Sequence, residues 1–278
     1  MNYLQAARAG GYAVGAFIVD SLDAMEGVAA ACGRAGLPAV MMAGMNTARF
    51  LGPERYVDLC RSVGRSCFVP VYAHLDHCTD PALLLQCARA GFDCVMFDGS
   101  QQSFEKNISA CAVLAEECHH LGTLLEGELG VIAGQEEHVE SALSQFTDPA
   151  LAEEFVRRSG VDALAVSVGN AHGLYQGKPE LQFGLLEELS ARCPIPLVLH
   201  GGTGIPAQDI RRAVGLGVCK INVGTELRRA YLDAVRDYAA QEGGTAIGLS
   251  QAIRERITAA SVGYLDNYRA EGCGHAAL

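Results

Sequence analysis

Strand-like and helix-like runs alternate along the whole chain, and this alternation limits the folds that the chain can adopt. An apolar run at 12–19 precedes a helical pattern at 21–34, which begins with a serine suited to capping a helix. The same pair recurs seven times, with strands expected at 38–42, 68–75, 94–97, 123–129, 163–168, 196–199 and 218–223. Eight strands that alternate with helices favour a parallel sheet, and eight is the number that closes a (β/α)8 TIM barrel.

No boundary between domains is visible in the sequence. The 278 residues, 50% of them hydrophobic, can bury a large core, and their length suits one barrel as well as two domains. However, no Pro/Ser-rich linker or low-complexity segment divides the chain. We therefore expect a single barrel domain over residues 1–278, with a helical extension at about 245–278.

Charge and cysteine usage restrict the partners of the protein. A net charge of −11 repels nucleic acid and anionic membranes, so a small-molecule partner is expected. The sequence has no apolar run of membrane-spanning length and its N-terminus lacks the layout of a signal peptide, which predicts a cytoplasmic protein. Its eleven cysteines contain no Cys-X-X-Cys pair, which indicates reduced core residues rather than disulfides or a thiolate zinc site.

Polar clusters follow the expected strands at their C-terminal ends. They are His74-Leu75-Asp76-His77, Asp98-Gly99-Ser100, Glu126-Gly127-Glu128, Gly169-Asn170-Ala171-His172-Gly173, His200-Gly201-Gly202-Thr203-Gly204 and Asn222-Val223-Gly224-Thr225-Glu226. In a barrel these ends open on one face, where active sites are built, so His77, His172 and His200 could meet. Three imidazoles with one open position are typical of catalytic zinc, although each histidine alone could be a hydrogen-bonded residue at the rim.

Strand geometry predicts which way the side chains of the cluster His74–His77 point. Side chains alternate along a strand, so His74 and Asp76 would share one face. By the same rule His77 would point the other way, or would lie on the following loop.

Glycines after the seventh and eighth strands indicate an anion site. Gly201-Gly202-Thr203-Gly204, before a helix that begins near Pro206, would present backbone N–H groups and a hydroxyl to a phosphate. Thr225, at the start of the next helix, offers the same chemistry. A tight turn between strand and helix would need glycine in any case, so this signal is weak alone.

Seven blocks, in order along the chain, give it a family resemblance. They are Gly11–Phe17, His74–His77, Asp98–Ser100, Glu126–Gly130, Asn170–Gly173, His200–Gly204 and Lys220–Glu226. With these blocks the chain resembles the class II, zinc-dependent fructose-bisphosphate and tagatose-bisphosphate aldolases, which are carbon-carbon lyases. The resemblance extends almost from end to end.

The resemblance implies roles for residues in several of these blocks. His77, His172 and His200 would bind Zn²⁺, which polarises the ketose carbonyl and stabilises the enediolate of dihydroxyacetone phosphate. Asp76 would be the acid/base on the hydroxyl derived from the aldehyde, and Glu136 would move the carbon-bound proton, although a solvated charge is an equal reading of Glu136. The phosphate would contact Gly173, Gly201, Gly202, Thr203, Asn222, Val223, Gly224 and Thr225.

Further ions and partners follow from the same resemblance. Asp98 and Glu128 are candidates for a second metal position, and a monovalent cation is a candidate cofactor near the phosphate loops. The partner would be a phosphorylated sugar. Similar enzymes are dimers or tetramers, so we expect a homodimer or homotetramer.

Two positions and one segment depart from the family pattern. Ile18 replaces an asparagine that helps to hold the substrate, and Gly44 replaces a serine or threonine, with Asn46 as a nearby polar residue. No arginine occurs between Arg236 and Arg254, where the bisphosphate enzymes carry one for the second phosphate. These changes suggest an aldehyde other than glyceraldehyde phosphate.

Two alternatives remain open at this point. A metal-dependent barrel hydrolase commonly carries His-X-His at the end of the first strand, which Phe17-Ile18-Val19-Asp20 does not offer. A catalytically weakened relative that serves as a binding subunit would explain Ile18 and Gly44. The presence of Asp76 argues against it, because a pure binder does not need the acid/base.

Overall fold

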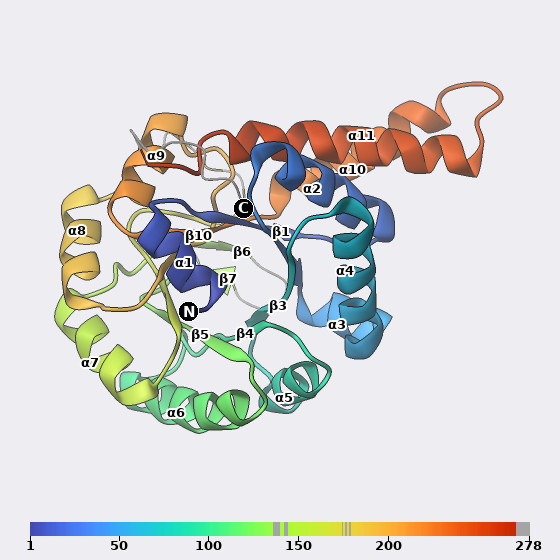
Figure 1. Cartoon of the computed structure of the whole chain (residues 1–278). Helices are drawn as coiled ribbons and strands as arrows, with labels where there is room; N and C mark the ends of the chain where they lie inside the picture. The colour runs from blue at the N-terminus through green and yellow to red at the C-terminus, as the bar shows by residue number, and fades with distance from the viewer. Residues whose placement is uncertain (136–139, 142–143, 174, 176, 178, 271–278) are drawn as a thin grey trace.

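Eight parallel strands form a closed barrel in the computed structural model, which describes residues 1–135, 140–141, 144–173, 175, 177 and 179–270. Around the barrel the strands follow the order β1, β10, β9, β8, β5, β4, β3 and β2 (Figure 1). Their bounds are β1 (Val14–Ile18), β2 (Ala39–Ala43), β3 (Val71–Cys78), β4 (Cys94–Phe97), β5 (Leu124–Leu129), β8 (Ala163–Val166), β9 (Leu197–Leu199) and β10 (Val218–Val223). The predicted (β/α)8 fold is confirmed.

Helices follow the strands and surround them as a ring (Figure 1). They are α2 (Leu22–Ala35), α4 (Pro53–Cys67), α5 (Pro81–Arg89), α6 (Phe104–His120), α7 (Pro149–Ser159), α8 (Phe183–Arg192), α9 (Ala207–Gly215) and α10 (Thr225–Ala239). Several start where the side chain before them accepts a backbone N–H: Ser21 caps α2, and Asp80 and Asp148 cap α5 and α7. A final helix, α11 (Ala246–Leu265), packs against α2 and α10, and the pair α10 and α11 extends beyond the ring.

Four short elements were not expected from the sequence. They are α1 (Tyr3–Gly10), α3 (Met45–Leu51), β6 (Gly134–Gln135) and β7 (Glu140–Ser141). Helix α1 lies across one end of the barrel in Figure 1, where the Tyr3 ring stacks on Tyr72 with 4.0 Å between centroids. A capping box between Asn2 and Gln5 begins α1, and this was the signal for it in the sequence.

Alternation along each strand divides the core into two layers. Inward residues such as Val14, Ala16 and Met42 fill the barrel together with α1, and outward residues such as Phe17 and Leu75 pack beneath the helices. The outer layer is the larger one, and burial of each large apolar side chain contributes roughly 1.5–3 kcal/mol to folding. The rigid barrel therefore provides a fixed base for the loops at its C-terminal end.

Two further expectations concern thiols and membranes. The ten cysteines that the structure describes are free thiols, and most are buried, in keeping with their expected place in the core. Among the described residues, none of the helices has the length and apolar character that crossing a membrane requires.

We propose that the chain is one domain, because β1 closes the barrel beside β10, which comes from the far end of the chain.

Candidate active site

His77 lies inside the barrel mouth although strand alternation predicted otherwise. Asp76 and His77 are consecutive and both buried, and both belong to β3. The pairing of β3 with β4 shifts register between Leu75 and Cys78, and His77 has φ 43°. A bulge with a left-handed residue rotates the following side chain, so two neighbours can face the same site. The prediction that His77 points away from Asp76 was therefore wrong.

Three histidines from distant parts of the chain meet at this end. His77 comes from β3, His172 from the loop after β8, and His200 directly follows β9. The ring of His77 has its centroid 4.8 Å from that of His172 and 4.6 Å from that of His200, and all three residues are buried. One nitrogen of each lies within 4.8 Å of the others. The structure thus brings together the set that the sequence singled out.

Carboxylates decide which nitrogen each histidine turns toward the centre. Nδ1 of His77 lies 2.8 Å from Asp98 Oδ2, and Nε2 of His200 lies 3.0 Å from Glu126 Oε1. An ionised carboxylate only accepts hydrogen bonds, so these nitrogens carry the protons. Nε2 of His77 and Nδ1 of His200 are left as the nitrogens with lone pairs, and carboxylates beyond metal-binding histidines commonly fix them in this way.

The remaining nitrogens fit a metal ion. Nε2 of His77 and Nδ1 of His200 face each other at 2.8 Å, where two lone pairs would repel unless a cation lay between them. Nε2 of His172 is buried and has no hydrogen-bond partner in the described part of the chain. Three neutral imidazole nitrogens are a donor set suited to Zn²⁺ and similar divalent metals. His77, His172 and His200 would hold such an ion.

The charges of the three histidines follow from their surroundings. Burial acts to lower the pKa of His77, but Asp76 and Asp98 outweigh it and raise that pKa well above 6.5. Burial lowers the pKa of His172 well below 6.5 and also lowers the pKa of His200, and the neighbouring His77 reinforces both shifts. Without a metal the cluster therefore keeps one proton, centred on His77, which a metal ion would displace.

A buried ion pair lies beneath the histidines. Lys220 Nζ lies 2.8 Å from Glu126 Oε2, both side chains are fully buried, and Nζ is also 3.5 Å from Nε2 of His74. Burial acts to raise the pKa of Glu126, but Lys220 and the hydrogen bond from His200 lower it from 4.5 to about 2. Glu126 thus stays ionised and orients His200. His74 faces this pair and not the three-histidine cluster.

Asp76 is placed as an acid/base beside the histidines. Its Oδ1 accepts a hydrogen bond from Nδ2 of Asn222 at 3.1 Å, and its side chain is nearly fully buried. Burial acts to raise the pKa of Asp76, but His77 and the nearby His74, whose Nε2 lies 3.8 Å from Asp76 Oδ1, lower it well below 3.8. The carboxylate is therefore ionised and can accept a proton from a bound hydroxyl.

Glycines shape the loops after β8 and β9. Gly201 has φ 64°, and a Cβ there would overlap the carbonyl oxygen of Ala171. The hydroxyl of Tyr175 joins these two loops, because it accepts from Ala171 N and donates to Gly201 O, each at 3.0 Å. Gly173, Gly201 and Thr203 then line a cavity together with His172 and His200.

The loop after β10 completes this cavity. Asn222, Gly224 and Thr225 line it, and α10 begins at Thr225 without a side-chain cap, which leaves N–H groups of its first turn for an anion. The N–H of Gly202 is already donated to Asn222 O, at 2.9 Å. The side chain of Val223 packs in the outer layer, so only its backbone could contact a ligand.

The other predicted residues have different positions. Oε2 of Glu128 is 3.9 Å from Nδ1 of His77 and is buried without a hydrogen-bond partner among the described residues, while Asp98 binds that same nitrogen. A second metal there would have to share His77. Glu136 lies outside the described residues, so its role stays a prediction.

Sequence reasoning gave no role to Lys220, Glu126 or Tyr175. The signal for the first two was an ionisable residue inside an apolar strand, since a buried charge requires a partner. Of the departures from the family pattern, Ile18 lines the cavity and would contact a Cβ at Gly224, whereas Gly44 caps α3.

Comparisons with known proteins agree with this geometry. Residues 1–272 match the model of a family described as fructose-bisphosphate aldolase class-II. A subunit of D-tagatose-1,6-bisphosphate aldolase from Klebsiella oxytoca is 38% identical over 85% of this chain and 84% of its own. A sulfofructosephosphate aldolase from Alkalicoccus urumqiensis is 40% identical over 81% of this chain and 79% of its own.

Solved structures give the same result. The YdjI aldolase from Escherichia coli K12 is 30% identical with a TM-score of 0.85, and the match covers 97% of this chain and 96% of that chain. A putative fructose-1,6-bisphosphate aldolase from Coccidioides immitis is 26% identical with a TM-score of 0.87, over 96% and 94% of the two chains.

Proposed function

Because the chain belongs to the family of class-II fructose-bisphosphate aldolases, we propose that it cleaves a phosphorylated ketose into dihydroxyacetone phosphate and an aldehyde with the help of Zn²⁺. The names of two relatives support a phosphorylated ketose, since one is a tagatose-bisphosphate aldolase subunit and the other a sulfofructosephosphate aldolase. Membership of this family argues against the hydrolase alternative.

One observation carries the proposal. The nitrogens with lone pairs on His77 and His200, together with Nε2 of His172, converge beside the ionised Asp76. A divalent metal bound there would act as a Lewis acid on the ketose carbonyl oxygen. Asp98 and Glu126 hold the protons on the outer nitrogens of His77 and His200, which keeps their lone pairs directed inward.

The residues of this chain provide the remaining steps. Asp76 accepts the proton of the hydroxyl on the far side of the bond to be cleaved, and that hydroxyl carbon becomes the aldehyde carbonyl. The electron pair of the broken bond passes to the dihydroxyacetone phosphate half, which then takes a proton at carbon, with Glu136 as the candidate donor. In condensation Asp76 returns its proton to the new hydroxyl. Asn222 holds Asp76 through its amide, at 3.1 Å.

The phosphate end of the substrate would lie on the glycine loops. Gly173, Gly201 and Thr203 line one side of the cavity, and Gly224 and Thr225 line the other. Free N–H groups at the start of α10 favour a dianion there because the helix dipole and the donors act together. A positively charged side chain is not required for this contact.

The test measures metal content and product release together. Purified protein should contain Zn²⁺ and release dihydroxyacetone phosphate from a ketose in a panel of fructose and tagatose bisphosphates, sulfofructose phosphate and ketose monophosphates. Chelation should stop release, and added Zn²⁺ should restore it. A protein without bound zinc and without release from any of these ketoses would overturn the proposal.

Two variants separate binding from chemistry. Asp76→Ala should keep the metal and lose cleavage, whereas His172→Ala should lose both, because only the histidine would contact the ion. Equal loss of metal in the two variants would contradict the role of Asp76. Metal binding by the wild type without cleavage would instead favour the alternative of a catalytically weakened binding subunit.

Family membership supports three lesser parts of the proposal. We expect a homodimer or homotetramer, which light scattering after size exclusion would measure. We also propose a monovalent cation near the phosphate loops. Activity should then fall when a bulky quaternary ammonium ion replaces K⁺ or Na⁺ in the buffer. A cytoplasmic location remains our proposal, and fractionation of the producing cells would test it.

A further inference from the structure

His172 differs from the other two histidines of the cluster in what holds it in place. Carboxylates accept hydrogen bonds from the rings of His77 and His200. In the described part of the chain, no carboxylate bonds the ring of His172. The direction of its imidazole therefore depends on its backbone, which sets where Cβ points and which rotamers are allowed.

The backbone of His172 is held by the loop that follows β5. Its N–H donates to the carbonyl oxygen of Ala133 at 2.7 Å, and Ala133 also pairs with Ala171 as an isolated parallel bridge. A distance of 2.7 Å is at the short end of the range for such bonds, so the two segments are in close contact. The contact joins the loops after β5 and β8, which are neighbouring strands of the barrel.

Gly134 makes this close contact possible. It has φ 112°, a conformation that side chains rarely adopt. A Cβ built on Gly134 would overlap the carbonyl oxygen of His172 and would lie 2.9 Å from the Cβ of His172. Any side chain at this position would therefore push the backbone of His172 away, and the imidazole with it.

The segment Val131–Gly134, which we call the support segment, is itself fixed at its base. Val131 exchanges two backbone hydrogen bonds with Gln145, both at 2.8 Å. The hydroxyl of Ser167 donates to the carbonyl oxygen of Val131 at 3.1 Å, and Ser167 is fully buried directly after the end of β8. The support segment is thus tied to the rigid barrel and can hold His172 against it.

We propose that the support segment positions His172 for the metal ion, and that this positioning depends on Gly134. The inference rests on the proposed metal-dependent function, because it concerns the third ligand. His77 and His200 keep their own carboxylate partners when the support is disturbed. Loss of the support should therefore weaken metal binding without abolishing it.

The test measures zinc affinity by competition with a chromogenic chelator. Gly134→Ala should weaken zinc binding by about 10–100-fold, the usual effect of losing a group that orients a metal-binding histidine. Co²⁺ in place of Zn²⁺ adds a second readout, because its visible absorption changes with the arrangement of its ligands, and the spectrum of Gly134→Ala should differ from that of the wild type. Ser167→Ala removes only one hydrogen bond from the support segment, so it should weaken zinc binding by about 2–10-fold.

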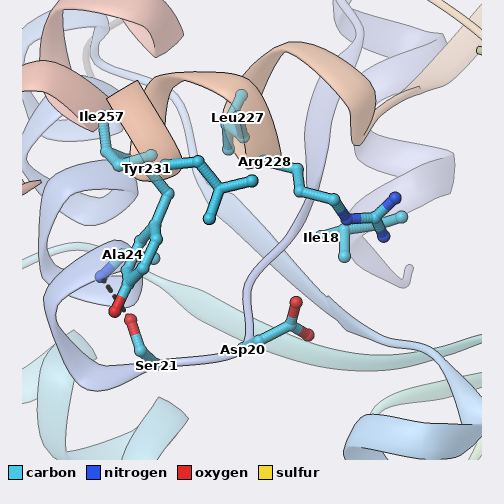
Figure 2. A pocket seen from close by; sticks show the side chains of 9 residues that line it. Ile18, Asp20, Ser21, Ala24, Leu227, Arg228, Tyr231 and Ile257 are labelled. Carbon is cyan, nitrogen blue, oxygen red and sulfur yellow. Dashed lines mark hydrogen bonds between the residues drawn. The ribbon is translucent and has the colours of Figure 1, made fainter. Parts of the chain in front are cut away.

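Two controls separate positioning of His172 from a general loss of stability. Gly91→Ala introduces similar strain, at φ 95°, just after α5, where a Cβ would be 3.9 Å from its nearest neighbour. Ser21→Ala removes the hydrogen bond from Ala24 that caps α2, which Figure 2 shows. Both controls should lower the midpoint of thermal unfolding and leave zinc affinity and the Co²⁺ spectrum unchanged.

Zinc affinity and a Co²⁺ spectrum equal to those of the wild type in Gly134→Ala would overturn the inference. An equal loss of affinity in the two controls would do the same. If Gly134→Ala does not fold, wild-type affinity in Ser167→Ala would overturn it. The proposed function survives these results as long as the wild type binds zinc and releases dihydroxyacetone phosphate, whereas a wild type that binds no zinc would refute both.

Discussion

Replacement of Lys220 by methionine should destabilise the barrel, because it leaves a buried carboxylate without its cation. Lys220 and Glu126 are fully buried and 2.8 Å apart, and methionine has a similar length without the charge. Within the described part of the chain, Glu126 would keep only its contact with His200 as a partner. The remaining negative charge would lie in a medium of low dielectric constant.

The size of the effect follows from the pKa of Glu126. Its reduction from 4.5 to about 2 corresponds to about 3 kcal/mol of stabilisation of the ionised form in the folded state. Removal of one partner from a buried pair typically costs roughly 3–5 kcal/mol. We therefore expect Lys220→Met to lower the free energy of unfolding by about 3–5 kcal/mol near neutral pH.

The sign of the pH dependence distinguishes this cause from poor packing. In the wild type the depressed pKa contributes stability that is present above about 4.5 and is lost as the pH falls toward 2. In Lys220→Met, burial without the ammonium raises the pKa of Glu126, so the carboxyl becomes neutral as the pH falls and its penalty disappears. The difference in the free energy of unfolding between wild type and variant should therefore become smaller as the pH is lowered from neutral to about 5.

Urea unfolding with a chelator present would measure these free energies without a contribution from bound metal. Lys220→Met with Glu126→Gln should be more stable than Lys220→Met alone, and its stability difference from the wild type should not narrow in this way, because neither position carries a charge. Arg192→Met, which removes only exposed ion pairs, is the control and should cost less than about 1 kcal/mol. The reasoning would be refuted if Lys220→Met lost no more free energy of unfolding than this control. It would also be refuted if the difference in that free energy between wild type and Lys220→Met stayed constant with pH.

Three further predictions concern the loops and the metal. Gly201→Ala should lower the free energy of unfolding by more than about 2 kcal/mol, because it combines strain at φ 64° with a clash against Ala171. Thermal melts would measure the loss. The control is Gly184→Ala, at an open helical position, which should be neutral or slightly stabilising. Tyr175→Phe removes the hydroxyl that joins the loops after β8 and β9, so the free energy of unfolding should fall by about 1 kcal/mol. KM should rise while the metal content stays unchanged. A changed metal content would show that the hydroxyl acts on His172 instead. Zinc affinity, measured by competition with a chromogenic chelator, should fall as the pH is lowered below the raised pKa of His77, because the metal would have to displace the proton that His77 holds. Affinity that is independent of pH would contradict that displacement.

The fold could be predicted from the sequence because its signal is local and repeated. Each strand of the barrel is an apolar run between turn residues, and eight such units leave few alternatives. Helices α1 and α3 were missed because they are short, and short helices depend on tertiary contacts more than on their own periodicity. Tyr3 and Tyr72, for example, stack across the barrel end although 69 positions separate them.

The site was predictable only as a set of residues at one end of the barrel. That His77, His172 and His200 lie together follows from strand ends that share a face. The inward turn of His77 does not follow, because the bulge depends on the register of β3 against β4. The partnership of Lys220 with Glu126 depends on strands β10 and β5, which are not neighbours in the sheet.

The two halves of the proposed substrate depend on different parts of the barrel. The metal half would be held by histidines whose orientation is fixed from below by Asp98 and Glu126, so almost any change there disturbs a buried charge. The aldehyde half would meet Ile18 at the end of β1, which lines the same cavity and takes no part in that buried network. We therefore expect substitutions at Ile18 to change the aldehyde that the site accepts at little cost in stability. This difference explains how a chain can keep the cluster of three histidines suited to a metal while it differs from the family pattern at Ile18.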